Sequence, residues 1–234
     1  MRLAVLETGV PPGDLPARFG RYPDMYQRML GLSDLLPAYD VAAGKLPARP
    51  EDHDAYIVSG SPAGVYEPLP WIAQLTDFLR AARGKARLVG ICFGHQAMAQ
   101  AFGGEVVKSG NGWGVGLHGY QVAARQSWMD AAERVSVPAS HQDQVAVQPP
   151  GTAVTLASAF TPFAGLAWED GSAISFQFHP EFDPAFAKAL IDARRDRLAD
   201  PEGAKATLDH PNDNARVGAW ISKFLASRPS WRGA

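Results

Sequence analysis

The sequence contains a single cysteine, Cys92, among its 234 residues. One cysteine excludes a disulfide within the chain and any metal site built from several thiolates. Low cysteine use is typical of proteins that fold in a reducing compartment, so we expect a cytoplasmic location.

The chain also lacks an excess of either charge, because 22 basic residues are balanced by 24 acidic ones and the formal net charge is −2. A protein that binds nucleic acid or an anionic membrane usually carries a basic patch or run, which this sequence does not have. The apolar run Leu3–Leu6 is interrupted at Glu7 and is too short for a signal peptide or a membrane span. We therefore expect small-molecule partners, with no nucleic acid and no membrane.

Signals for a cofactor are equally scarce. The six histidines are scattered, without an H-E-x-x-H pattern or a cluster with carboxylates, so no metal is expected. Gly114–Gly119 matches G-x-G-x-x-G, but the strand-like Tyr120–Ala123 follows it in place of the helix that a dinucleotide site requires. The sequence predicts no cofactor.

What is present is an alternation of short apolar runs and amphipathic stretches. Strands are predicted at Leu3–Leu6, Ala55–Ser59 and Leu88–Ile91, with helices at Tyr22–Leu32 and Trp71–Ala82 between them. This order is typical of an α/β protein with a parallel sheet. We predict one domain over residues 1–234, with a mixed, mostly parallel sheet flanked by helices.

After the helix predicted to follow Cys92, the pattern becomes richer in short strands, some of them antiparallel. These strands are predicted at Glu105–Val107, Gly119–Val122, Val145–Val147, Ala153–Leu156 and Ile174–Phe178. Two helices are expected at the end of the chain, at Pro184–Leu198 and around an apolar stripe from Val217 to Leu225. Three segments rich in proline and glycine are predicted as loops, namely Val10–Pro16, Pro47–Asp52 and Ala199–Asn214.

Cys92 follows the strand at Leu88–Ile91 and precedes a predicted helix, with Gly90 and Gly94 on either side of it. A side chain at such a strand-to-helix turn projects from the sheet edge, and small neighbours let the tight backbone close. The nearby helix N-terminus favours a thiolate. A lone buried cysteine is more often a small hydrophobic residue, but this setting indicates a nucleophile elbow.

A cysteine nucleophile needs a base and a carboxylate that orients it. His179 and Glu181 follow the last predicted strand, and in extended backbone their side chains would share one face. Taken alone, they fit a loop histidine and an acid near a helix start. Combined with Cys92, they predict a Cys-His-Glu triad.

Three segments resemble the class I, triad-type glutamine amidotransferases, especially the glutaminase domain of GMP synthase and its stand-alone relatives. They are Gly90–Gln96, Ser140–Asp143 and Gln177–Glu181. The resemblance covers roughly residues 3–190 and leaves 191–234 as a C-terminal helical extension. It implies a flavodoxin-like α/β fold.

The resemblance also implies a reaction. Cys92 would attack the side-chain amide of glutamine, form a γ-glutamyl thioester and release ammonia, with His179 as base and Glu181 as its partner. The oxyanion hole would use the amides of Phe93 and of the Ser59–Pro62 turn, where Gly60 and Ser61 are the candidates.

Further positions match substrate contacts of the family: Gln96 on the nucleophile helix, and Asp143 as partner of the substrate's α-amino group, with Ser140 and His141 shaping the same loop. Competing interpretations are an exposed helix residue for Gln96 and an ordinary polar turn for the other three positions. The glycine-containing segments Thr8–Tyr22 and Gly110–Gly119 are expected to form a lid or a specificity surface.

The sequence alone is compatible with three functions. The chain has no phosphate-binding loop of the G-x-x-x-x-G-K-[ST] type and is too short to include a synthetase domain. We expect an enzyme that cleaves the γ-glutamyl amide of glutamine and releases ammonia, for which a separate ammonia-accepting synthetase is a possible partner. The alternative within the enzyme class is a free-standing hydrolase of γ-glutamyl peptides, so the substrate is glutamine or another γ-glutamyl compound. A catalytically silent binding or scaffold protein is the alternative of another class.

Overall fold

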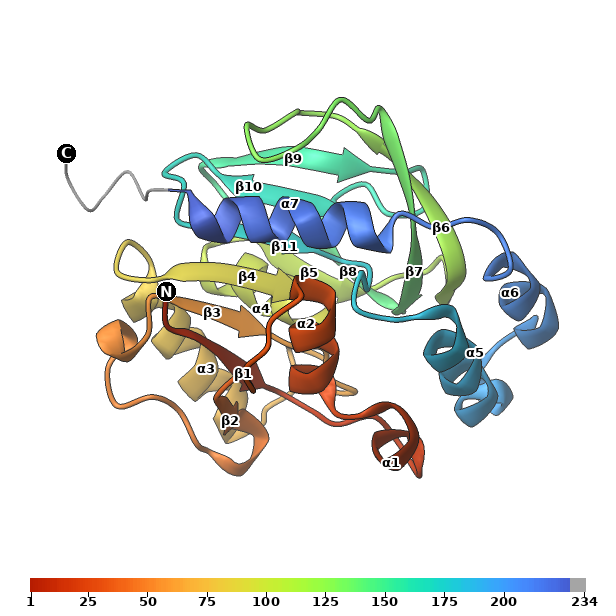
Figure 1. The fold of residues 1–234 in the computed structure, drawn as a ribbon, viewed down its shortest axis with the longest axis horizontal. Coiled ribbons are helices and arrows are strands. Elements are labelled where there is room, and N and C mark those ends of the chain that lie inside the picture. The colour runs from red at the N-terminus through yellow and green to blue at the C-terminus, as the bar shows by residue number, and fades with distance from the viewer. Residues whose placement is uncertain (228–234) are drawn as a thin grey trace.

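A twisted sheet of nine strands runs through the centre of the molecule in the computed structural model, which describes residues 1–227 (Figure 1). The strand order is β2-β1-β3-β4-β11-β10-β9-β6-β7, and β5 pairs with β8 in a separate two-stranded ribbon. One continuous sheet with helices on both faces is the predicted α/β architecture.

The first half of the sheet is parallel. Its strands are β2 (Ala38–Asp40), β1 (Leu3–Glu7), β3 (Ala55–Val58), β4 (Arg87–Ile91) and β11 (Ala173–Phe176). All neighbouring pairs among them run in the same direction. The strands β1, β3, β4 and β11 are buried along their whole length, which explains their continuous apolar runs.

The second half is antiparallel. It consists of β10 (Gly165–Trp168), β9 (Thr152–Ala157), β6 (Gly114–Val122) and β7 (Arg134–His141). The ribbon pairs β5 (Glu105–Lys108) with β8 (Asp143–Val147). The predicted mixed sheet, with antiparallel strands after the nucleophile helix, is confirmed.

Helices cover both faces of the sheet (Figure 1). One face carries α3 (Pro70–Ala82) and α4 (Phe93–Ala101), and the other carries α2 (Tyr22–Leu30) and α7 (Asn214–Ala226). The short α1 (Leu15–Phe19) and the helices α5 (Pro184–Ala193) and α6 (Pro201–Thr207) lie at one end of the molecule. Single 3₁₀ turns occur at Val41–Ala43, Pro50–Asp52 and Arg195–Arg197.

The apolar stripes that predicted two of these helices are buried against the sheet. In α3 the buried positions include Ile72, Leu75 and Leu79, and in α7 they include Val217 and Ile221. Burying a side chain of this kind stabilises the fold by roughly 1.5–3 kcal/mol. The apolar stripe of α7 therefore packs this helix against the sheet.

The predicted loop Ala199–Asn214 is wrong, because it contains α6. The Asp200 carboxylate caps this helix by accepting a hydrogen bond from the Gly203 amide at 2.8 Å, and Pro201 occupies the first turn. An aspartate followed by proline starts a helix as readily as a loop, so composition alone did not distinguish the two.

Several boundaries also differ from expectation. The helix predicted over Pro184–Leu198 ends at Ala193 and continues only as a 3₁₀ turn. The strand predicted at Gly119–Val122 begins at Gly114, so more than half of the expected lid Gly110–Gly119 is part of the sheet. Conversely, Ile174–Phe178 is a strand only as far as Phe176.

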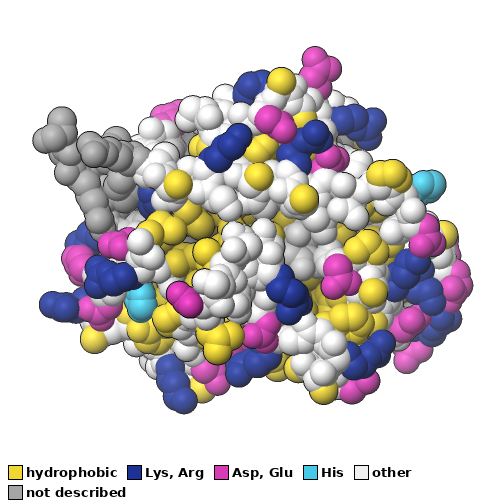
Figure 2. All heavy atoms as spheres, in the orientation of Figure 1, with side chains coloured by type: hydrophobic (Ala, Val, Ile, Leu, Met, Phe, Trp, Pro, Cys, Tyr) yellow, Lys and Arg dark blue, Asp and Glu magenta, His cyan; other side chains and the backbone are white. Residues whose placement is uncertain are grey.

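Opposite charges are interspersed over the face drawn in Figure 2, including the region of α5 and α6. Apolar side chains show between them in small groups. Across residues 1–227, every helix is too short or too polar to cross a membrane.

Candidate active site

Cys92 occupies a strained turn between β4 and α4. Its φ of 53° and ψ of −102° make it the one non-glycine residue with a positive φ among residues 1–227. Its amide donates to the Phe176 carbonyl at 2.8 Å, and its carbonyl accepts from the Gln96 amide at 3.1 Å. Such backbone strain costs about 1–3 kcal/mol and persists only where the surroundings enforce it, which is a feature of functional sites.

The two flanking glycines allow this turn to pack. A Cβ atom on Gly94 would lie 2.2 Å from the Val58 carbonyl oxygen of the neighbouring strand. A Cβ atom on Gly90 would lie 2.6 Å from the Gly94 carbonyl oxygen. A side chain at Gly94 would push α4 away from β3, and one at Gly90 would push α4 away from β4, so the G-x-C-x-G spacing reflects close backbone contact as predicted.

His179 and Glu181 form a buried pair at the end of β11. The imidazole Nδ1 lies 2.8 Å from Glu181 Oε1, and the two side chains are 3% and 0% exposed. The backbone between them is a turn rather than the extended segment that the sequence suggested, because the Phe182 amide donates to the His179 carbonyl at 3.3 Å. The turn still brings both side chains together.

The electrostatics of His179 favour its charged form. Burial by itself would lower the pKa of His179, but the Glu181 carboxylate and the Cys92 side chain outweigh it and raise the pKa to about 9. An imidazolium next to a thiol is the arrangement that activates cysteine nucleophiles.

An aromatic stack fixes the plane of the imidazole. The ring centroids of Phe182 and His179 lie 3.8 Å apart at an interplanar angle of 7°, and the Tyr22 ring stacks with Phe182 at an interplanar angle of 14°. The backbone amide of His179 donates a hydrogen bond to the Pro138 carbonyl at 2.8 Å. The imidazole is therefore held by packing as well as by Glu181.

Gly60 lies directly against this cysteine and histidine. A Cβ atom on Gly60 would be 3.2 Å from His179 Cε1 and 3.9 Å from Cys92 Cβ. The turn is braced by Thr8, whose hydroxyl donates to the carbonyls of Ser59 and Gly60 at 3.0 and 3.1 Å. Phe93 is the first residue of α4, so its amide has no acceptor within the helix.

A cavity of about 580 Å³ opens above the elbow. Its walls come from the loop after β1, the Ser61–Glu67 segment, the β7–β8 junction and the C-terminal end of α5. Cys92 lines this cavity, whereas His179 and Glu181 are buried behind it. The volume lies within the range of roughly 300–1,000 Å³ that is typical of small-molecule sites.

The predicted substrate positions also lie at this cavity. Gln96, Ser140, His141 and Asp143 all line it, together with Ser61. Gln96 is buried rather than exposed, and its amide nitrogen donates to the Asp143 carbonyl at 2.9 Å. This bond ties the nucleophile helix to the start of β8.

The two polar residues beside Asp143 are already engaged within the protein. Ser140 Oγ accepts a hydrogen bond from Arg194 at 2.9 Å, and His141 Nδ1 lies 3.2 Å from the Asp143 carbonyl. Burial lowers the pKa of His141 to about 3, so its imidazole is neutral. Burial raises the pKa of the Asp143 carboxyl group, an effect that the Tyr66 hydroxyl and Lys108 oppose.

Other residues of the cavity were not predicted from the sequence. They are Tyr66 and Glu67 beside Asp143, Trp113 before β6, and Arg194 and Arg197 after α5. Only Trp113 had a signal, because it lies in the glycine-containing segment 110–119. Arg194 and Arg197 fall beyond the stretch that carries the resemblance.

The buried His95 makes no contact with this cavity. Its Nδ1 lies 2.8 Å from Ser175 Oγ, and burial lowers its pKa to about 3. A neutral imidazole hydrogen-bonded to the sheet has a packing role.

Fold and site together define an α/β protein in which a strained cysteine at a strand-to-helix elbow adjoins a buried histidine-glutamate pair. The model of the class-I glutamine amidotransferase family matches residues 37–192. The chain therefore belongs to this family, and its sheet matches the architecture of the family's known structures.

Relatives of known sequence differ in length. A glutamine amidotransferase-like protein of Schizosaccharomyces pombe is 24% identical over 95% of this chain and 98% of its own length. Gamma-glutamyl peptidase 4 of Arabidopsis thaliana is 24% identical over 91% of this chain and 90% of its own. The glutamine-hydrolysing GMP synthase of Thermus thermophilus is 33% identical over 66% of this chain, but this match spans only 29% of that enzyme.

Among solved structures, a glutamine amidotransferase from Thermotoga maritima superposes with a TM-score of 0.76 at 19% identity. The match covers 97% of this chain and all of the other. This similarity establishes the fold.

Proposed function

We propose that this protein hydrolyses γ-glutamyl amide bonds, with Cys92 as the nucleophile. The proposal rests on one observation above all: the strained Cys92 and the His179-Glu181 pair meet around Gly60. Membership of the class-I glutamine amidotransferase family supports the same bond as the target.

In the proposed reaction, Cys92 Sγ attacks the carbonyl carbon of the γ-glutamyl amide, and His179 holds the thiol proton. The C–N bond then breaks as His179 gives this proton to the departing amine, which leaves a γ-glutamyl thioester. Water adds to the thioester with loss of a proton to His179, and the C–S bond breaks to release glutamate and the thiol. Glu181 orients the imidazole and stabilises its charged form.

The tetrahedral oxyanion would form beside the Gly60 turn. We assign the amides of Phe93 and Gly60 as its donors, with Ser61 as the neighbouring alternative. Phe93 adds the positive end of α4 to this position. The Thr8 hydroxyl holds the Gly60 carbonyl and thereby fixes the direction of the turn.

The γ-glutamyl group would be recognised by the wall that joins α4 to the β7–β8 junction. We assign Asp143 as the partner of the α-ammonium group and Gln96 as the residue that positions Asp143. The neutral His141 and the engaged Ser140 shape this wall.

Of the two enzymatic functions, we favour the free-standing hydrolase of γ-glutamyl peptides. The relative named gamma-glutamyl peptidase matches this chain over nearly the whole length of both, and the cavity extends well past Cys92. The similarity to GMP synthase supports a second candidate, a glutaminase that passes ammonia to a separate synthetase.

The two candidates are separated by assaying the purified protein alone. We expect turnover of γ-glutamyl dipeptides without any added protein, measured as release of glutamate. Glutamine serves as the comparison substrate, and the Cys92→Ala variant as the blank. Turnover of glutamine that is faster than that of every dipeptide would overturn the free-standing peptidase in favour of the glutaminase.

A second prediction concerns pH. Burial would lower the pKa of His179, but the Glu181 carboxylate and the Cys92 side chain raise it to about 9, so the imidazolium of the free enzyme is retained up to that pH and lost above it. We therefore expect kcat/KM to fall on the alkaline side near pH 9. In Glu181→Gln the remaining burial lowers the pKa of His179, so this limb should move down by about one to three pH units.

The pH profile of kcat/KM with a γ-glutamyl anilide, whose leaving group is uncharged, measures this shift in wild type and in Glu181→Gln. Glu51→Gln is the matched control, since Glu51 is an exposed carboxylate paired with Lys85. An alkaline limb at the same pH in wild type and Glu181→Gln would contradict the role given to Glu181.

A further inference from the structure

The cavity above Cys92 carries opposite charges from different elements. Glu67 and Asp143 line it from the β3–α3 loop and the start of β8, and Lys108 adjoins them. Arg194 and Arg197 line it from the end of α5 and the 3₁₀ turn that follows. This distribution allows more than one charged group of a ligand to be recognised.

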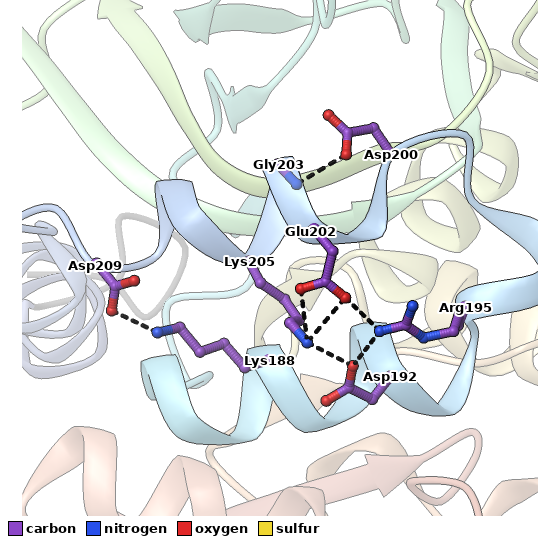
Figure 3. A network of polar contacts seen from close by, with 8 residues as sticks. All are labelled: Lys188, Asp192, Arg195, Asp200, Glu202, Gly203, Lys205 and Asp209. Carbon is purple, nitrogen blue, oxygen red and sulfur yellow. Dashed lines mark hydrogen bonds and ion pairs between the residues drawn. The ribbon is translucent and has the colours of Figure 1, made fainter.

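The cations at the end of α5 fall into two sets. In the network of Figure 3, Arg195 and, from α6, Lys205 are paired with the carboxylates of Asp192 and Glu202. Arg194 and Arg197, which face the cavity, have no carboxylate partner within residues 1–227. A cation that lines a cavity without a counter-ion is suited to an anionic ligand.

Arg194 is also held in a defined position. It is half-buried, one of its Nη atoms donates to Ser140 Oγ at 2.9 Å, and its guanidinium lies 5.8 Å from the centre of the Trp113 ring. One hydrogen bond leaves other N–H groups of the fork available, and these match the two oxygens of a carboxylate. Burial raises the pKa of the Tyr22 hydroxyl, and Arg194 lies close enough to oppose this rise.

The elements that carry this arginine and tryptophan are braced against each other. The network of Figure 3 links the end of α5 to α6, and Lys188 adds a contact to Asp209. On its other side α6 holds β6, because the Leu117 amide donates to Thr207 Oγ1 at 2.8 Å. The relative position of Arg194 and Trp113 is thus built into the fold.

The number of charges indicates the ligand. A γ-glutamyl donor carries an ammonium and a carboxylate on one carbon atom. A neighbouring anion and cation, such as Asp143 and Lys108, would bind the ammonium and the carboxylate respectively. The group released from glutamine is ammonia, which offers no anion to Arg194 and Arg197. An amino acid or peptide released from a γ-glutamyl peptide does carry a carboxylate.

We propose that Arg194 and Arg197, together with Trp113, form a subsite for the carboxylate of the leaving group in γ-glutamyl peptides. This inference rests on the proposed hydrolase function and names its substrate class. Arg194 would bind the carboxylate through its free N–H groups, Arg197 would add a second positive charge, and Trp113 would limit the space around the chain of the leaving group.

The test compares two substrates that differ only in that carboxylate, γ-glutamylglycine and γ-glutamylglycinamide. For the wild type we expect kcat/KM to favour the acid by about 10- to 100-fold, which is the value of a charge-assisted hydrogen bond. Arg194→Gln should remove this preference, mainly through KM, and leave the glycinamide within about threefold of wild type. Arg194→Lys should restore part of the preference.

Arg195→Gln is the matched control, because Arg195 follows directly in the chain but is paired with Asp192 and Glu202 and does not line the cavity. It should keep the wild-type preference. Equal turnover of acid and amide by the wild type, or an equal loss of both in Arg194→Gln, would overturn the subsite while leaving the hydrolase function standing.

A binding measurement separates the subsite from the chemistry. In the Cys92→Ala background, calorimetry should show tighter binding of γ-glutamylglycine than of the glycinamide, and Arg194→Gln should abolish the difference. If the wild type hydrolyses neither compound, the hydrolase proposal fails. If γ-glutamylglycine binds to Cys92→Ala no more tightly than the glycinamide does, the subsite proposal fails, whatever the outcome for hydrolysis.

Discussion

Replacing Cys92 with alanine should lower the hydrolysis of γ-glutamyl amides by at least about 10⁴-fold. Removing the nucleophile of a triad eliminates the covalent route, and the oxyanion donors alone retain little of the rate. The backbone strain at position 92 is unchanged by alanine, so the melting temperature should stay within a few degrees of wild type. Steady-state kinetics and thermal unfolding measure the two effects.

Covalent labelling of the thiol tests the same site independently. Because the sequence holds a single cysteine, an electrophilic glutamine analogue that attaches to the thiol reports on Cys92 alone. Mass spectrometry should show one adduct on the wild type and none on Cys92→Ala. An unlabelled wild type that also hydrolyses no γ-glutamyl amide would favour the catalytically silent binding protein.

The second large effect is expected at Gly94, where alanine should destabilise the whole fold. Its Cβ atom would lie 2.2 Å from the Val58 carbonyl oxygen and 2.8 Å from Val58 Cβ, so α4 must move away from β3. Overpacking against backbone in a dense core costs about 3 kcal/mol or more. In a chain of this size that corresponds to a drop in the melting temperature of about 6–12 °C.

Gly110→Ala is the control for Gly94→Ala. Nothing lies within 4 Å of a Cβ atom at Gly110, so this variant should melt at or slightly above the wild-type temperature. Chemical unfolding of both variants tests whether the contact, rather than the loss of a glycine, causes the effect. Equal stability of Gly94→Ala and wild type would show that the elbow can shift away from β3 without cost.

The helices and strands that the sequence predicts correctly are those with a local, repeated pattern of apolar residues. The runs at Leu3–Leu6 and Leu88–Ile91 are continuous because their strands are buried on both faces, and that pattern is visible without coordinates. The apolar stripe around Val217 likewise identified α7. The helix α6 was missed, since the aspartate and proline that start it have the same composition as a turn.

The candidate site was predictable to the same extent. Cys92, Gly90 and Gly94 are close in the chain, and the turn that they form follows from the steric limits of a strand-to-helix elbow. His179 and Glu181 are also local to each other. That Gln96 is buried and bound to the Asp143 carbonyl was not visible, because the bond joins residues from separate elements.

The sequence by itself determined the α/β class, the elbow around Cys92 and the His179-Glu181 pair, since each depends on neighbours within a few residues. Only the tertiary structure decided what surrounds the thiol. Arg194, Trp113 and Asp143 come from three different elements and meet because α5, β6 and the β7–β8 junction pack around one cavity. Long-range packing, which leaves no periodic mark on a single chain, therefore sets which ligand the site can hold.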